Sequence, residues 1–265
     1  MRSIRAFAER MSRGVVLKRR LPLAVGGSPV FVSPDAALRF WRYDLAKTDP
    51  ALFRWAAELI HSGDVVWDIG ASLGLFTFAA ANLAATSGRV LAVEPDTWQV
   101  DILRRSARSN SQHRAPVDIL PAAVTNVIGV AQFVVARRGR SSSHLLGAES
   151  SQAGGCRESH QVVTVTLDWL MHNYTAPRLV KIDVEGTEDL VLSGGEELLS
   201  VVRPTLLCEV SDGCAEAVTN TLRRHGYALF DADLQPHARR PLGHAVWNTL
   251  ARPQPAQSRD QTSTP

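Results

Sequence analysis

The sequence predicts an α/β protein with a largely parallel sheet and helices on both of its faces. Three observations support this fold class. Short apolar runs alternate with helix-like stretches, two successive runs end in the acids Asp68 and Glu94, and the turn after the first carries Gly70 and Gly74. A strand, a glycine-bearing turn, an Ala-rich helix and a second strand ending in an acid form a βαβ unit suited to a nucleoside. The 265 residues are ample for a sizeable core.

The expected strands are short apolar runs bounded by polar or turn residues. They cover residues 65–68, 90–93, 117–120, 179–182, 205–209, 228–230 and 245–250. The expected helices cover residues 73–85, 98–109, 188–192 with 196–201, and 214–225. Ligands of such sheets bind outside the carboxyl ends of the strands. We therefore expect Asp68, Glu94, Asp183 and Glu209 to converge on one edge.

The segment 131–166 departs from this alternation. Residues 131–135 and 162–166 are typical of two β arms, whereas 137–159 is rich in Arg, Ser and Gly and has no period. We expect a hairpin with a long mobile tip, inserted after the third or fourth strand, that covers or selects a substrate. His144 and His160 lie in it, and either is a candidate general base, although a lone loop histidine is more often solvated.

The two ends of the chain differ from the domain between them. Residues 1–49 form a basic segment that packs on the domain or precedes it, the main domain spans 50–251, and the polar tail 252–265 is expected to be disordered. An apolar stripe recurs at helical spacing in the first segment, at Ile4, Phe7, Met11 and Val15. We expect this stripe to pack on the domain, with contact to a membrane surface or a partner as the weaker alternative.

Composition narrows the class of protein. The net charge of +3 is modest and no aromatic-plus-basic motif is present, so we expect no nucleic-acid partner. The three cysteines form neither a CxxC pair nor an even disulfide framework, which favours a reducing compartment. No apolar stretch has the length of a spanning helix. These features predict a cytoplasmic protein.

The turn after residue 68 distinguishes two kinds of cofactor. A dinucleotide loop has the pattern Gly-x-Gly-x-x-Gly and holds a pyrophosphate, but its first glycine is replaced here by Asp68. A carboxylate there repels phosphate and attracts a cation. S-adenosylmethionine carries an ammonium and a sulfonium but no phosphate, so it fits better than NAD. Glu94 can accept hydrogen bonds from ribose hydroxyls of either molecule. An NAD-linked oxidoreductase is therefore the first alternative function.

A second group of charged residues follows the strand at 179–182. Asp183 and Glu185 leave it together, and Gly186 permits a sharp turn into a helix whose first turn contains Glu188. The two carboxylates can orient a sulfonium, accept a proton or hold a divalent metal. A metal would need further oxygen ligands from Glu209, Ser211 and Asp212. Oxygen-only spacing is weak evidence, so a metal is possible but not favoured and no ligand is assigned.

Together these motifs resemble the FkbM family of S-adenosylmethionine-dependent methyltransferases. They are Asp-Ile-Gly-Ala-Ser-Leu-Gly-Leu-Phe-Thr at 68–77, Val-Glu-Pro at 93–95, Ala-Ala-Val at 122–124, Thr-Leu-Asp at 166–168, and Lys-Ile-Asp-Val-Glu-Gly-Thr-Glu at 181–188. The likeness runs from about Pro50 to Leu250. It implies a class I methyltransferase Rossmann-like fold, a seven-stranded sheet with an antiparallel last strand, and methyl transfer usually to oxygen. The implied acceptor is a small molecule or a carbohydrate.

The resemblance also implies roles for residues. Asp68, Gly70 and Gly74 would line the methionine end of the cofactor, Glu94 would bind ribose, and Ala122 or Ala123 would lie near adenine. Ser72, where the family commonly has Asn, completes the cofactor set with Thr77 and Pro95. Asp183 and Glu185 would stand beside the methyl group. Asp183 is the first choice for the base that takes the hydroxyl proton, with His144 as runner-up. A cofactor-binding partner protein without catalysis is the second alternative.

Overall fold

A seven-stranded sheet forms the centre of the computed structural model, which describes residues 7, 9–109, 113–147 and 154–255. Its order is β12-β13-β11-β10-β3-β4-β5. The strands are β3 (Val65–Ile69), β4 (Arg89–Val93), β5 (Val117–Leu120), β10 (Leu179–Ile182), β11 (Thr205–Glu209), β12 (Tyr227–Asp231) and β13 (Asn248–Pro253). Only β13 runs antiparallel to its neighbours. The expected mostly parallel sheet with an antiparallel last strand is confirmed.

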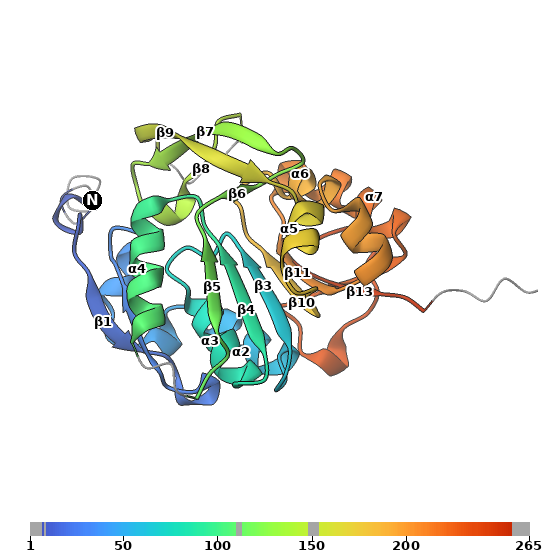
Figure 1. The fold of residues 1–265 in the computed structure, drawn as a ribbon, viewed down its shortest axis with the longest axis horizontal. Helices are drawn as coiled ribbons and strands as arrows, with labels where there is room; N and C mark the ends of the chain where they lie inside the picture. The colour runs from blue at the N-terminus through green and yellow to red at the C-terminus, as the bar shows by residue number, and fades with distance from the viewer. Residues whose placement is uncertain (1–6, 8, 110–112, 148–153, 256–265) are drawn as a thin grey trace, which may run out of the picture.

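Helices cover both faces because alternate strand residues point to opposite sides. Val66 packs in one buried cluster with α2 (Pro50–Leu59), α3 (Leu75–Ala84) and α4 (Thr97–Arg108). Trp67 and Ile69 pack in the other, with α5 (Leu167–Asn173), α6 (Glu188–Ser193), α7 (Ala215–Arg224) and the π-helical turn Leu198–Val202. The same layers are visible in Figure 1. The continuous apolar runs of the strands follow from this two-sided burial.

Two of these helices were not among the expected ones, although each begins at a recognisable cap. The carboxylate of Asp49 accepts the N–H of Leu52 before α2, which also has Pro50 in its first turn. The hydroxyl of Thr166 accepts the N–H of Trp169 before α5. These short polar signals precede helices of only 10 and 7 residues, whose apolar period is brief.

The N-terminal part packs on the α4 side of the sheet. The antiparallel strands β1 (Leu17–Arg20) and β2 (Pro29–Val32) bring Val30 and Val32 into the cluster that contains α3 and α4. Short 3-10 turns follow at Leu23–Val25, Leu38–Trp41 and Leu45–Lys47. The expected packing of the earlier helical stripe is wrong for Phe7 and Met11, whose side chains are exposed. Ile4 lies outside the described residues.

The insertion and the chain just before it form a second sheet of order β6-β9-β7-β8 across the carboxyl ends of β3, β4 and β5 (Figure 1). Its strands are β6 (Ala123–Val124), β7 (Gly129–Ala136), β8 (His144–Leu145) and β9 (Cys156–Val165). The two expected arms are β7 and β9. The expected mobile tip is wrong for its first part, because Arg140 in the 3-10 turn Arg140–Ser142 is buried and holds the chain against the domain. Residues 148–153 lie outside the described part.

The last strand starts and ends about three residues later than expected. Arg252 pairs with Ala228 and Pro253 with Tyr227, so these residues belong to β13 and not to a disordered tail. The strand lies between β11 and β12, which set its register, and a proline is tolerated at its end. The tail beyond residue 255 lies outside the described residues. Among the helices of the described chain, none has the length and apolar character needed to cross a bilayer.

Candidate active site

A cavity of about 840 Å³ opens at the carboxyl ends of the central strands. Its floor contains Gly70, Glu94, Asp183 and Glu209 from four of these strand ends. Its walls come from the insertion, residues 138–145, and from the N-terminal part, residues 36–40. The volume lies in the range of small-molecule and cofactor sites, and the place is where open α/β sheets bind ligands.

One side of the cavity, which we call the Glu94 side, consists of Ser72, Glu94, Pro95, Ala122 and Ala123. Glu94 is only 4% exposed. Its Oε2 accepts the N–H of Ser72 at 2.8 Å and its Oε1 accepts the N–H of Asp96 at 2.8 Å. Burial raises the pKa of Glu94 to about 8, against the effect of these two hydrogen bonds. The carboxyl is therefore held in one orientation by backbone groups.

Ser72 is in the left-handed backbone region, with φ of 49°. Its hydroxyl donates to Oε1 of Gln99 at 2.8 Å and lies 3.3 Å from the hydroxyl of Ser141. Asn tolerates this backbone region better than Ser does. The structure therefore explains why asparagine suits this position and places Ser72 at the junction of β3, α4 and the insertion.

Asp68 is not on the cavity wall, and its contact with the cofactor stays a prediction. Its side chain is 1% exposed, accepts the hydroxyl of Thr77 at 2.6 Å, and lies 3.4 Å from Nζ of Lys181. Thr77 and Gly74 are absent from the cavity wall as well. Gly74 has φ of 82°, and a Cβ there would lie 2.5 Å from Leu103. Asp68, Gly74 and Thr77 therefore support the turn from its buried side. Of the two glycines, Gly70 alone lines the cavity.

The opposite side, which we call the Asp183 side, gathers Lys181, Asp183, Glu185 and Glu209 on the cavity wall. Nζ of Lys181 donates to Oδ2 of Asp183 at 3.1 Å. Burial alone would lower the pKa of Lys181, but Asp183 and Asp68 raise it above its ordinary value. The lysine is therefore a fixed cation between the two acids.

Glu185 and Glu209 are the weakly acidic groups of this side. Burial, together with the neighbouring charge of Asp183, raises the pKa of each to about 8. Glu185 also has a left-handed backbone, with φ of 59°. Such strained positions in non-glycine residues concentrate at functional sites. A carboxyl with a pKa near the working pH can exchange a proton during a reaction.

Glu188 is structural. It lies in the first turn of α6, and its two oxygens accept the N–H of Gly186 at 2.8 Å and the hydroxyl of Ser211 at 2.9 Å. This contact joins the turn after β10 to the chain after β11. The described residues contain no group of three or more His, Cys, Asp or Glu side chains placed to hold a metal ion.

The two histidines of the insertion have different surroundings. His144 lines the cavity, and its Nδ1 lies 3.2 Å from the carbonyl oxygen of Ser142. A carbonyl can only accept, so Nδ1 is the donor in this contact. His160 packs edge-on against Phe133 and is not on the cavity wall.

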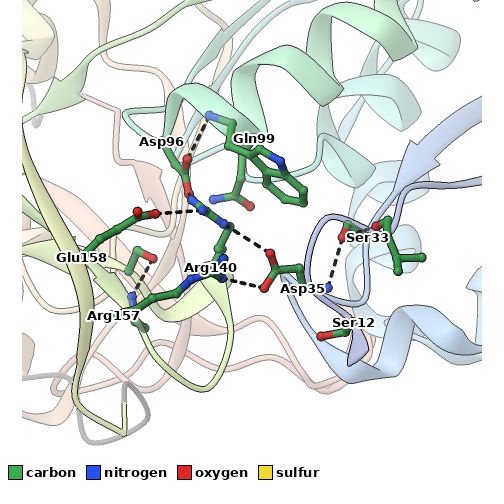
Figure 2. A network of polar contacts seen from close by, with 12 residues as sticks. Ser12, Ser33, Asp35, Asp96, Gln99, Arg140, Arg157 and Glu158 are labelled. Atoms are coloured by element: carbon green, nitrogen blue, oxygen red, sulfur yellow. Dashed lines mark hydrogen bonds and ion pairs between the residues drawn. The ribbon is translucent and has the colours of Figure 1, made fainter. Parts of the chain in front are cut away.

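The sequence reasoning missed Arg140 and its partners. Figure 2 shows its guanidinium between Asp96, Asp35 and Glu158, residues of three separate segments. Asp96 could have been found as the cap of α4, because Asp before a helical run is a capping signal. Lys181 could have been found as a charge inside an apolar strand. Arg140 has no local signal, since it lies in an aperiodic stretch.

The sheet order, the single antiparallel strand and the cavity at the strand ends define a class I methyltransferase. The family description "Methyltransferase FkbM domain" matches residues 68–229, more than half of the chain. The chain belongs to the FkbM family of methyltransferases.

Similar proteins include one relative in sequence and two in structure. "Hexuronic acid methyltransferase AglP" of Haloferax volcanii is 26% identical over 182 residues, which cover 67% of this chain and 69% of that protein. The solved structure of "Methyltransferase FkbM" from Methylobacillus flagellatus KT is 15% identical, covers 66% of this chain and 47% of that chain, and has a TM-score of 0.38. The solved structure of precorrin-6y C5,15-methyltransferase from Geobacter metallireducens is 13% identical, covers 77% of this chain and 86% of that chain, and has a TM-score of 0.42. Neither structural likeness is close enough to indicate a substrate.

Proposed function

We propose that this protein transfers a methyl group from S-adenosylmethionine to a hydroxyl of a saccharide. One observation carries the proposal: a single cavity holds an oriented carboxyl on the Glu94 side and proton-exchanging carboxyls on the Asp183 side. The first suits a ribose and the second suits a hydroxyl nucleophile.

The charges in the cavity fit this cofactor. Glu94 is fixed by the N–H groups of Ser72 and Asp96, and each of its oxygens keeps acceptor capacity for a ribose hydroxyl. Lys181 already forms ion pairs with Asp68 and Asp183, so it is not available to bind a pyrophosphate. A cationic ligand stabilises the charged form of the remaining carboxyls, which a phosphate would oppose. When bound, S-adenosylmethionine supplies a methyl group activated by its positively charged sulfur.

The chain's own contribution is alignment, exclusion of water and removal of a proton. We assign the role of proton acceptor to Glu185, whose pKa of about 8 lies close to neutral pH. Asp183, which forms an ion pair with Lys181, would instead stabilise positive charge. The prediction that Asp183 itself is the base stays untested. His144, which lines the cavity from the insertion, remains the other candidate.

A saccharide acceptor is supported by the relative that methylates a hexuronic acid and by the cavity wall. Trp247 lines the cavity next to β13 and is 45% exposed, so its ring offers a flat apolar surface to a bound molecule. Arg138 lines the same cavity and is exposed, which gives a cation for an acidic sugar.

Calorimetric titration with S-adenosylhomocysteine and with NAD tests the cofactor. We expect the first to bind and the second not to. Methyl transfer to p-nitrophenyl β-glucuronide, followed by formation of S-adenosylhomocysteine, tests the acceptor class. Binding of NAD in preference, or no turnover with any glycoside or uronide of a panel, would contradict the proposal.

Substitutions at the three candidate bases separate their roles. Glu185→Gln should lower kcat by about 100-fold, in the range of general-base catalysis, and leave the affinity for S-adenosylhomocysteine nearly unchanged. Asp183→Asn and His144→Ala serve as the competing variants, and Glu216→Gln on the exposed surface of α7 is the control. If Asp183→Asn abolishes turnover while Glu185→Gln does not, the base is Asp183.

A further inference from the structure

Two segments far apart in the sequence together cover the Glu94 side of the cavity. We call residues 36–40 and 139–144 the two-part cover, since all of these residues line the cavity. The N–H of Arg140 donates to the carbonyl of Asp35 at 3.0 Å, and the N–H of Ser141 donates to that of Ala36 at 3.2 Å. A Cβ on Gly139 would lie 2.5 Å from the oxygen of Ala36. The two segments therefore meet backbone to backbone.

The side chain of Arg140 joins this cover to the domain. It is 8% exposed. Its Nη1 donates to Asp96 at 2.8 Å, its Nη2 donates to Glu158 at 2.8 Å, and its Nε lies 3.6 Å from Asp35 (Figure 2). The guanidinium also stacks over the ring of Trp98, 4.9 Å from its centre. One buried cation thus binds three acids, from the N-terminal part, the start of α4, and β9.

Two short paths lead from Arg140 to the Glu94 side. Oδ2 of Asp96 accepts a hydrogen bond from Nη1 of Arg140, and the N–H of Asp96 donates to Oε1 of Glu94. Ser141, the next residue after Arg140, lies against Ser72, whose N–H donates to Oε2 of Glu94. The orientation of both oxygens of Glu94 therefore depends on residues that Arg140 holds.

We propose that Arg140 is a positioning residue for the nucleoside of the cofactor: it holds the two-part cover closed and fixes Asp96, and through it Glu94. This inference rests on the proposed function. Both Nη groups and the Nε of Arg140 face protein carboxylates, so the residue acts through the cover and does not itself bind the ligand. Removal of the guanidinium leaves the buried carboxylate of Asp96 without its counter-charge, whereas Asp35 keeps Arg157 at 2.8 Å.

The test compares Arg140→Ala and Arg140→Lys with Arg239→Ala. Arg239 is a matched control, because it is also buried and forms a two-point ion pair, with Glu58, but it lies off the cavity wall. We expect Arg140→Ala to weaken S-adenosylhomocysteine binding by about tenfold or more, and Arg140→Lys to restore part of it through Asp96. Arg239→Ala should lower the melting temperature while its dissociation constant stays within about twofold of the wild type.

Hydrogen exchange of the ligand-free protein supplies a second readout. Arg140→Ala should accelerate exchange in residues 139–145 and 36–41, and Arg239→Ala should not. A folded Arg140→Ala that binds S-adenosylhomocysteine as tightly as the wild type, or equal weakening by Arg239→Ala, would overturn the inference. If the wild type itself does not bind the molecule, the proposed function fails, and the exchange data alone decide whether Arg140 holds the cover. If Arg140→Ala does not fold, Arg140→Lys and Asp96→Asn carry both measurements.

Discussion

Gly70 touches Asp183 through bare backbone. A Cβ built on Gly70 would lie 1.8 Å from the carbonyl oxygen of Asp183, and Gly70 has φ of 77°. The N–H of Asp183 donates to the carbonyl of Ile69, the last residue of β3, at 3.0 Å, so the pairing continues one residue beyond β10. This contact sets how closely the turn that supports Glu94 approaches the residues of the Asp183 side. A glycine is required there for the backbones to meet.

Gly70→Ala should therefore lower the free energy of unfolding by at least about 2 kcal/mol and abolish S-adenosylhomocysteine binding, because both the collision and the positive φ oppose a side chain. Urea denaturation and calorimetry measure the two effects. Gly213→Ala is the control, since a Cβ there meets nothing within 4 Å. Normal binding by Gly70→Ala would show that the contact does not set the cavity.

Removal of the buried cation at the strand ends should be costly. Lys181 is 7% exposed and lies between Asp68 and Asp183. Lys181→Met leaves both acids unpaired, and we expect a loss of about 3–5 kcal/mol in the free energy of unfolding. Adding Asp68→Asn to this variant should recover part of the loss. Denaturant unfolding of the single and double variants checks this, and a Lys181→Met protein of wild-type stability would contradict it.

Cofactor binding should release a proton from Glu94. Burial raises the pKa of this carboxyl in the free protein to about 8. Ribose hydroxyls donating to the carboxylate favour its charged form and lower the pKa on binding. The affinity for S-adenosylhomocysteine should therefore rise as the pH increases from about 6.5 toward 8. Calorimetry in buffers of different ionisation enthalpy measures the proton count, and Glu94→Gln should remove this release along with much of the affinity.

The free energy of unfolding of the ligand-free protein should fall as the pH rises between the ordinary and the raised pKa values of Glu185 and Glu209. Their pKa values are raised from 4.5 to about 8, so between these limits the folded state binds more protons than the unfolded state. The free energy of unfolding then decreases with rising pH. Melting temperatures from pH 5.5 to 8.5 should show a flatter profile for the double variant Glu185→Gln, Glu209→Gln. An identical slope in both proteins would contradict this assignment.

Strand positions could be predicted because the runs at 65–69 and 89–93 are apolar on both faces of the sheet. The direction in which the acidic side chains point could not be predicted. Asp68 is the fourth residue of β3, with Ile69 still to follow, so it points into the helix layer toward Thr77. Glu94 comes one residue after β4 ends and is free to face the cavity. This difference of one position decides which acid lines the cavity, and the sequence pattern marks both acids alike.

Contacts between distant segments were equally hidden. Arg140 joins Asp35, Asp96 and Glu158, and no local period or composition relates these four positions. The later start of β13 has a similar cause, because its register depends on pairing with β11 and β12. The local sequence therefore predicted the strands and the candidate carboxyls. The walls of the cavity depend on contacts between distant segments, which the local sequence does not show.

The stretch matched to the family begins at residue 68 and ends at 229, but the cavity wall also takes Phe40, Trp55 and Trp247 from outside it. The cavity is thus lined both by residues of the matched stretch and by residues from the two terminal regions. An exchange of residues 36–55 or 236–248 between family members should accordingly transfer acceptor preference and leave cofactor chemistry in place.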